Sequence, residues 1–223
     1  MRSDLADFEL VTARSLGEAH ARVAEGYRPL AGVTDVMVLL SSGKLAHRRW
    51  VDVGALQELR FVRVTDAAFE LGALTTYTDV RGHPLLSREM PMLAQAASET
   101  GGLAIQNRGT LGGNIGNASP AADSPPALLA YGAHIVLSSH RGERTIDYAD
   151  FHVGYKKTLA APDEMVARLV LPRVKGGRRV HYYRKVGPRR AQAISKVCFA
   201  ACVDRDGGGM TGARIALGGV APV

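Results

Sequence analysis

Short apolar segments alternate with helical segments over roughly the first 55 residues, and this alternation restricts the fold more than any other feature of the sequence. The apolar segments predict strands at residues 8–11, 29–32 and 50–54. Helices are predicted between them at residues 15–26 and 34–43, the first capped by Ser15 and ended by Gly26, the second capped by Thr34 or Asp35. The region therefore predicts a βαβαβ-like unit.

The rest of the chain is richer in strands. Two strand segments at residues 59–66 and 67–73 precede helical segments at residues 75–86 and 90–100. Further strands are expected at residues 134–139, 143–147, 164–171, 179–185, 196–203 and from 213 onward. The fold class is α+β, with two subdomains that meet near residues 55–60.

Composition excludes several classes of protein. The chain has 223 residues, of which 46% are hydrophobic and 22% charged, so it can bury a core and is not disordered. No apolar run is long enough to span a membrane, and acidic residues near the N-terminus lead us to expect a cytoplasmic protein. Cys198 and Cys202 lie in a predicted strand, where four residues span about 13 Å. We expect buried, reduced thiols, because a disulfide needs Cα atoms within about 7 Å.

The formal net charge of +7 leaves the partner open. Basic residues cluster at residues 48–50, 173–179 and 182–190. A nucleic-acid-binding protein is one interpretation, but zinc-finger spacing, an aromatic RNA-binding signature and a helix-turn-helix pattern are all missing. The clusters are otherwise a solvated face, or a surface for an anionic cofactor or acidic partner.

Two glycine-containing turns are the candidate ligand sites. Residues 30–37 form a strand-to-helix turn whose backbone N–H groups could hold an anion. In residues 109–114, adjacent Gly112 and Gly113 permit close backbone approach, and their N–H groups could form an anion nest between Thr110 and Asn114. An ordinary tight loop is the alternative. The standard hydrolase, metalloprotease and phosphate-loop motifs are absent, and the histidines do not pair at ligand spacing, so neither catalytic nor metal residues are predicted.

Asp123 precedes a segment suited to start a helix, with Ser124 as N-cap and Pro125 in the first helical position. The carboxylate either complements the helix terminus or accepts hydrogen bonds from a ligand. Two phosphate-suited turns and an acidic acceptor fit a dinucleotide better than RNA or DNA.

Residues 110–130, TLGGNIGNASPAADSPPALLA, resemble the FAD-binding domain of the molybdenum hydroxylases, the family of xanthine dehydrogenase and carbon monoxide dehydrogenase. The other similar segments follow in the family's order at residues 30–40, 69–81, 151–158, 162–172 and 182–197. The resemblance implies a two-subdomain FAD-binding fold of the vanillyl-alcohol-oxidase (PCMH) type, with FAD between the subdomains. It divides the chain into an N-terminal subdomain (1–57), a second subdomain (58–210) and the start of a largely missing C-terminal domain (211–223).

The resemblance also implies the cofactor contacts. The first turn would wrap the pyrophosphate and the second would hold its other side and the flavin end, while Asp123 would anchor polar groups, Val166 offer an apolar contact and Lys185 a cationic one. Lys196 matches a more distant basic position. The implied FAD-binding residues are Leu30, Ala31, Gly32, Val33, Thr34, Asp35, Val36, Met37, Gly109, Thr110, Leu111, Gly112, Gly113, Asn114, Asp123, Val166 and Lys185.

The sequence departs from the family pattern at three places. The family commonly has two glycines where this chain has Gly32 and Val33, which predicts a looser approach to the pyrophosphate. Thr100 stands where some relatives carry a stacking aromatic residue. The third departure is the C-terminal domain, without which we expect the strand near residues 213–218 to be poorly covered and the chain to dimerise or require its partners.

The resemblance implies an oxidoreductase subunit that passes electrons from an iron–sulfur partner through FAD to NAD+ or another acceptor. Its partners would be a large subunit with the molybdenum cofactor and a small [2Fe-2S] subunit, with a homo-oligomer as a further expectation. Two alternatives remain: a cofactor-free interaction subunit that has lost FAD binding, and the nucleic-acid-binding protein.

Overall fold

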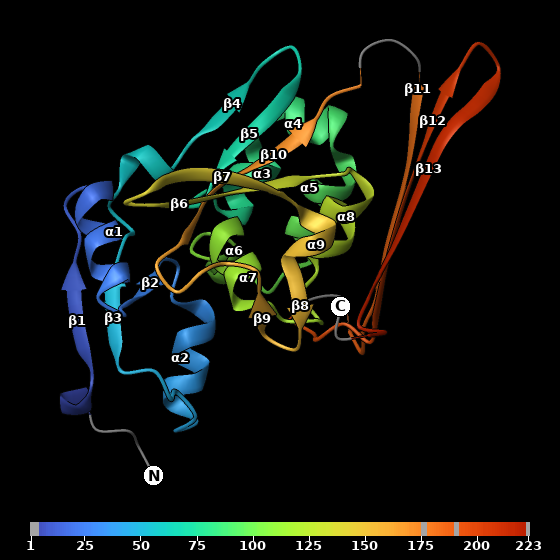
Figure 1. The fold of residues 1–223 in the computed structure, drawn as a ribbon. Coiled ribbons are helices and arrows are strands. Elements are labelled where there is room, and N and C mark those ends of the chain that lie inside the picture. Colours follow the sequence, from blue (N-terminus) through green and yellow to red (C-terminus); the bar gives the residue numbers. More distant parts are fainter. Residues whose placement is uncertain (1–4, 175–177, 190–191, 222–223) are drawn as a thin grey trace.

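The computed structural model describes residues 5–174, 178–189 and 192–221 (Figure 1). Parts of two predicted basic clusters, residues 175–177 and 190, therefore lie outside the described residues.

A three-stranded parallel sheet forms the N-terminal unit, as the βαβαβ pattern predicts. After a short 3₁₀ turn at Leu5–Asp7, the elements follow in the order β1 (Glu9–Thr12), α1 (Leu16–Ala24), β2 (Arg28–Leu30), α2 (Thr34–Ser41) and β3 (Arg49–Asp52). The strand order is β1-β3-β2, and both neighbours run parallel to β3. The Ser15 side chain caps α1 by accepting from the Glu18 N–H at 3.2 Å. Gly26 follows α1 with φ of +90°, a conformation that glycine adopts readily.

A five-stranded antiparallel sheet forms the second unit. Its order is β4-β5-β10-β6-β7. The strands are β4 (Val62–Val64), β5 (Ala68–Gly72), β6 (His134–Ser139), β7 (Gly142–Asp147) and β10 (Met165–Pro172). Side chains of β10 alternate between buried and half-buried positions, as expected for the central strand of a sheet with two different faces.

The segment between β5 and β6 is mostly helical, and more so than predicted. A 3₁₀ turn at Gln57–Leu59 enters this unit. The helices are α3 (Tyr77–Gly82), α4 (Pro84–Glu89), α5 (Pro91–Glu99), α6 (Leu103–Gln106), α7 (Leu111–Asn117) and α8 (Ser124–Ala130). After β7 come α9 (Tyr148–Phe151) and a small hairpin of β8 (His152–Gly154) and β9 (Lys157–Thr158). Helices α6 and α7 are unpredicted. At α8 the predicted cap is wrong by one position, because Asp123 occupies the N-cap position and Ser124 is the first helical residue.

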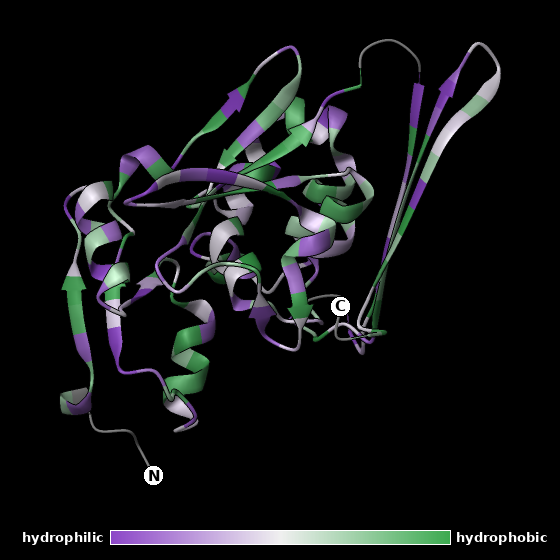
Figure 2. Cartoon of the chain, viewed as in Figure 1, coloured by the Kyte–Doolittle hydropathy of each residue, from purple (hydrophilic) through white to green (hydrophobic). Residues whose placement is uncertain are grey.

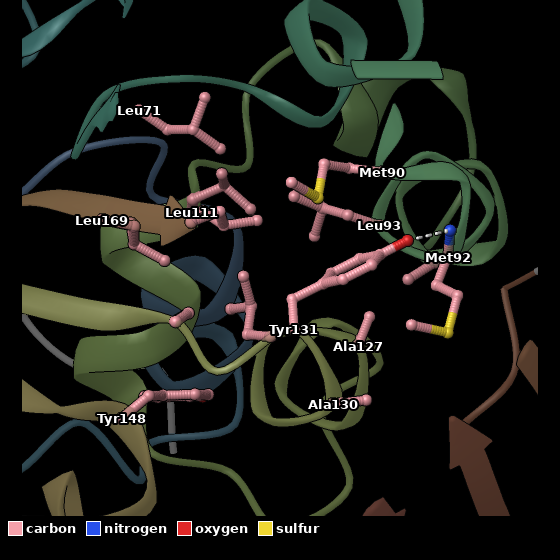
Figure 3. Packing of buried hydrophobic residues seen from close by; sticks show 14 of the residues in the cluster. Leu71, Met90, Met92, Leu93, Leu111, Ala127, Ala130, Tyr131, Tyr148 and Leu169 are labelled. Atoms are coloured by element: carbon pink, nitrogen blue, oxygen red, sulfur yellow. Dashed lines mark hydrogen bonds between the residues drawn. The ribbon is translucent and has the colours of Figure 1, made fainter. Parts of the chain in front are cut away.

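The main hydrophobic core lies between these helices and the five-stranded sheet (Figure 3). The buried Tyr131 at the end of α8 points toward α5, where its hydroxyl accepts a 3.0 Å hydrogen bond from the Met92 N–H. A second core belongs to the parallel sheet but includes Leu74, Met165 and Ala167 from the second unit. The two units are therefore packed against each other.

A third sheet, β11 (Arg178–Val186), β12 (Val197–Asp206) and β13 (Gly209–Gly218), stands at one side of the molecule (Figure 1). Cys198 and Cys202 lie on β12, buried and unbridged, as predicted. Outward-facing Ile215 is 68% exposed and Leu217 is 52% exposed, which agrees with the expected poor cover of residues 213–218. The expected boundary at 210/211 falls within β13.

Candidate functional site

A cavity of about 580 Å³ lies between the parallel sheet and the second unit. Its walls come from β2 and α2 on one side, and from α7, the β8–β9 hairpin and β10 on the other. Most of the residues that the sequence implies as cofactor contacts line it: Leu30, Ala31, Gly32, Val33, Thr34, Asp35, Val36, Gly109, Thr110, Gly112, Gly113, Asn114 and Val166. The structure thus brings the two predicted turns and a strand that is far away in sequence to one cavity.

The N-terminus of α2 offers free hydrogen-bond donors to this cavity. The Met37 N–H donates to the Val33 carbonyl at 2.9 Å and closes the first turn. The N–H groups of Thr34, Asp35 and Val36 donate to no group within the described residues, and no side chain caps the helix. Neither Thr34 nor Asp35 is therefore the cap that the sequence predicts. Unpaired N–H groups at a helix N-terminus, with the helix dipole behind them, form a site for an anion.

Val33 precedes α2 in a left-handed conformation, with φ of 67° and ψ of −3°. A β-branched residue rarely adopts this conformation, because its side chain crowds the backbone there. Glycine carries no such penalty. The family's second glycine thus corresponds to a position of positive φ, and this chain holds a strained valine in it.

Gly32 is required by close contact between the two turns. A Cβ added at Gly32 would lie 1.9 Å from the carbonyl oxygen of Arg108. The Arg108 side chain in turn donates to the Gly32 carbonyl at 3.4 Å. Gly32 therefore lets the α2 turn lie against the chain that enters α7.

The backbone N–H groups of the second predicted turn already donate hydrogen bonds within the protein. Residues 110–114 form the start of α7, with Thr110 as the N-cap. The Gly113 N–H donates to the Thr110 hydroxyl at 3.1 Å, and the Leu111 and Gly112 N–H groups donate to the carbonyls of Thr75 and Ala73, both at 2.9 Å. The interpretation of these N–H groups as free anion donors is therefore wrong, although the helix still lines the cavity.

Asn114 carries an unsatisfied polar atom at the cavity wall. Its side-chain carbonyl oxygen is buried and accepts no hydrogen bond from the described residues. Buried polar atoms are rarely left without a partner. A ligand that donates a hydrogen bond would satisfy this atom, so the site fits a polar cofactor.

Asp123 and Lys185 do not line the cavity but bind each other. The Lys185 ammonium lies 2.7 Å from Asp123 Oδ2, and both side chains are buried. Asp123 Oδ1 accepts from the Ser195 hydroxyl at 2.5 Å, and the Tyr183 hydroxyl donates to the Asp123 carbonyl at 2.9 Å. These contacts join α8 to the β11–β12 sheet. Met37 on the exposed side of α2 and Leu111 in the core also lie away from the cavity.

The cavity has polar lining residues that sequence reasoning missed. They include Arg28, Lys44, His47, Trp50, Tyr77, Lys156 and Glu164. Arg28 and Trp50 lie on neighbouring parallel strands, β2 and β3, and are paired in register. Lys156 lies in the β8–β9 turn with φ of 53°.

Tyr77 and Glu164 are among the cavity residues whose pKa values are shifted. Burial raises the pKa of the Tyr77 hydroxyl, and the nearby negative charges of Asp35 and Asp123 raise it further. Hydrogen bonds from Arg144 hold the pKa of Glu164 below its ordinary value, since Nε and Nη2 of the guanidinium lie 2.6 and 2.7 Å from the two carboxylate oxygens. Tyr77 thus stays neutral and Glu164 stays charged near neutral pH.

Comparison with known proteins identifies the family. Residues 6–174 match the family model described as the FAD binding domain in molybdopterin dehydrogenase. The chain belongs to this FAD-binding family. The matched region contains the whole cavity and ends before β11, so the third sheet lies outside it.

Proteins of this FAD-binding family are similar to the chain over most of its length. The glyceraldehyde dehydrogenase medium chain of Sulfolobus acidocaldarius is 33% identical over 217 residues, which are 96% of this chain and 76% of the relative. The putative xanthine dehydrogenase FAD-binding subunit of Escherichia coli K12 is 34% identical over 194 residues, 86% of this chain and 66% of that protein. The chain is thus an FAD-binding medium subunit of the molybdenum hydroxylase type.

Solved structures support the same fold. Carbon monoxide dehydrogenase of Hydrogenophaga pseudoflava matches with a TM-score of 0.91 and 28% identity, covering 97% of this chain and 76% of that chain. This agreement confirms the predicted PCMH-type fold. Within the described residues, no helix has the length and apolar character to cross a bilayer, and no cluster of three or more His, Cys, Asp or Glu side chains could hold a metal ion.

Proposed function

We propose that this chain holds FAD in the cavity and transfers electrons from an iron–sulfur partner, through the flavin, to NAD+ or another acceptor. The observation that carries the proposal is the free N-terminus of α2. The N–H groups of Thr34, Asp35 and Val36, which have no partner among the described residues, line a cavity at the carboxyl ends of parallel strands. Ligands of α/β sheets bind at this edge, and phosphates bind at helix N-termini.

The proposed cofactor contacts follow from this position. The α2 turn, residues 30–36, would hold the pyrophosphate, while Asn114 would accept a hydrogen bond from FAD through its unsatisfied oxygen. Val166 on β10 would supply an apolar wall. Asp123 and Lys185 would act on the site indirectly, because their buried ion pair joins α8 to the third sheet.

Bound FAD would supply the redox chemistry, accepting and releasing electrons at its isoalloxazine ring. The chain's own residues bind and orient the cofactor. The proposal requires no general acid or base from the protein. The shifted pKa values of Tyr77 and Glu164 leave both side chains in their ordinary charge states at neutral pH.

The proposed partners are a large subunit with the molybdenum cofactor and a small [2Fe-2S] subunit, and the chain would form a homo-oligomer through them or by itself. Relatives support this: one is the medium chain of a carbon monoxide dehydrogenase and another is subunit alpha of a 6-hydroxypseudooxynicotine dehydrogenase complex. The isolated chain is expected to hydroxylate no substrate.

Reconstitution tests the proposal. Apoprotein mixed with FAD and freed of excess cofactor by gel filtration should retain the visible absorption of a flavin, with one FAD per chain. It should then be reduced by a reduced iron–sulfur protein and reoxidised by NAD+ or a quinone. A colourless protein after gel filtration would favour the cofactor-free interaction subunit. Co-elution with DNA or RNA in place of FAD would favour the nucleic-acid-binding protein.

A further inference from the structure

Helix α1 joins the parallel sheet to the second unit. The helix carries both hydrophilic and hydrophobic residues (Figure 2), and its buried Ala19 and Val23 pack in the second core with Leu74 and Met165 of the second unit. Val23, Leu74 and Met165 also line the cavity. The position of α1 against the second unit therefore affects the shape of the cavity.

His20 connects α1 to β6, the strand beside it (Figure 1). Its Nε2 atom lies 2.9 Å from the Ser138 hydroxyl oxygen and hydrogen-bonds with it. Both residues are buried, His20 with 9% of its surface exposed. His20 and Val23 are three positions apart, so their side chains are neighbours on the surface of α1. A change at His20 therefore acts on the turn of α1 that lines the cavity.

The charged groups that act on the His20 imidazole are His140 and Glu143. His140 lies in the turn between β6 and β7, and Glu143 lies on β7. Glu143 is already paired with Arg168 on β10, whose Nη1 lies 2.7 Å from a carboxylate oxygen. The other titratable residues on α1 and on β2, β3 and β6, the strands packed against it, interact with groups other than His20: Glu18, Arg22, Arg28, Arg49, Asp52 and His134.

These surroundings disfavour a proton on His20. Burial lowers the pKa of His20 below its ordinary value of 6.5, the positive charge of His140 lowers it further, and the negative charge of Glu143 acts in the opposite direction. A His20 released from β6 regains water and takes up a proton near pH 6.5. The contact is therefore at full strength above this pH and weakens as the pH falls below it.

We propose that the His20–Ser138 contact is an acid-sensitive connection between the two units: a proton on His20 separates α1 from β6 and loosens the cavity that holds FAD. The effect on FAD rests on the proposed function, whereas the effect on α1 does not. At pH 5.5 a released histidine carries the proton about ten times as often as not, so His20 shifts the balance by about tenfold at most. Retention of the cofactor then depends on pH in the mildly acidic range.

Hydrogen exchange of the apoprotein tests the connection without the cofactor. Protection factors of the α1 amides, which are corrected for the intrinsic pH dependence of exchange, should fall between pH 7.5 and pH 5.5. The fall should be larger in the parent than in His20→Gln, by a factor of up to about tenfold. Glutamine keeps an amide that can hydrogen-bond to Ser138 but has no group that titrates in this range.

His134→Gln is the matched control. It removes a histidine from the same strand, β6, whose Nε2 lies 3.4 Å from Asp147 on β7. The fall in α1 protection should therefore equal that of the parent.

His140→Gln is a second variant that leaves the buried contact intact, because the His140 side chain is 59% exposed. Removal of its positive charge brings the pKa of His20 closer to the ordinary value. The fall in α1 protection should therefore be smaller than in the parent and larger than in His20→Gln.

Calorimetric titration with FAD at pH 7.5 and pH 5.5 tests the effect on the cavity. The loss of FAD affinity on acidification should be larger in the parent than in His20→Gln, again by up to about tenfold. Equal losses in these two proteins, alongside different falls in α1 protection, would overturn the effect on the cavity.

An equal fall of α1 protection in the parent and His20→Gln, or a fall in His134→Gln as small as that in His20→Gln, would overturn the connection. The proposed function fails separately. Absence of FAD binding at both pH values, with the expected difference in α1 protection, rejects the flavin function and keeps the connection. FAD binding with equal falls in α1 protection does the reverse.

Discussion

The Lys185 ammonium and the Asp123 carboxylate form a buried ion pair at 2.7 Å, and the side chains are only 5% and 9% exposed. The ammonium also donates to the Glu99 carbonyl at 2.9 Å. Three segments, the end of α5, the start of α8 and β11, therefore meet at one lysine.

Removal of this lysine should weaken the fold. Lys185→Met leaves a buried carboxylate without its counter-charge, and such a loss costs about 3–5 kcal/mol. Urea unfolding of the apoprotein measures it. Lys196→Met, at an exposed position, is the control and should change stability by less than about 0.5 kcal/mol. The double variant Lys185→Met with Asp123→Asn should recover part of the loss; equal stability of Lys185→Met and the parent would show that the pair does not hold these segments together.

Val33→Gly should stabilise the chain. A non-glycine residue at this left-handed position stores about 1–3 kcal/mol of strain. Glycine releases it but adds unfolded-state entropy worth about 0.5–1 kcal/mol, so we expect a net gain of about 1 kcal/mol. Val38→Gly serves as the control because it makes the same exchange inside α2, at a residue 66% exposed, and should destabilise. A lower unfolding midpoint for Val33→Gly than for the parent would contradict the strain.

Gly112 and Gly116 lie on the same helix and should respond in opposite directions to alanine. At Gly112 the added Cβ would lie 2.6 Å from the Cβ of Ala73 and 2.8 Å from its carbonyl oxygen, so we expect a loss of about 1–3 kcal/mol. At Gly116 nothing lies within 4 Å, and the better helix propensity of alanine should add about 0.5–1 kcal/mol. Thermal unfolding should place the midpoint of Gly112→Ala below that of the parent and the midpoint of Gly116→Ala above it. A Gly112→Ala protein as stable as the parent would mean that α7 does not pack on Ala73.

The helix at residues 111–117 illustrates where sequence reasoning stops. Parallel strands and helices in the first 55 residues could be predicted because apolar spacing and capping residues are local signals. Three glycines within residues 111–117 favour a loop by propensity. The helix forms because Thr110 caps it and Gly112 fits against Ala73, a contact between segments far apart in sequence.

Only part of the candidate site could be predicted, because only part of it depends on local sequence signals. Its turns are local, and the resemblance placed Thr34, Asn114 and Val166 correctly at one cavity. The pairing of Asp123 with Lys185, 62 residues away, could not be read from either residue alone. The resemblance implies each as a cofactor contact, and the sequence alone does not show which partner a buried charge finds.

Acid should weaken the fold in part through Glu164. Its folded-state pKa lies below the ordinary value of 4.5 because of Arg144, so its contribution is present above that value and is lost as pH falls below it. Glu164→Gln should therefore be less stable than the parent at pH 7, and the difference should shrink below about pH 4. Unfolding midpoints across this range measure it. A difference that stays constant with pH would show that Arg144 does not act on Glu164 as an ion pair.

Calorimetric titration of the apoprotein with FAD tests the central claim most directly. The α2 N-terminus and the Asn114 oxygen predict saturable binding of one FAD per chain, and Gly32→Val should abolish it because its side chain would meet the Arg108 carbonyl. A circular dichroism spectrum of Gly32→Val that matches the spectrum of the parent would show that the variant is folded and that the loss of FAD binding is local. Absence of heat from FAD with the folded parent protein, or undiminished binding in folded Gly32→Val, would contradict the assignment of this cavity as the flavin site.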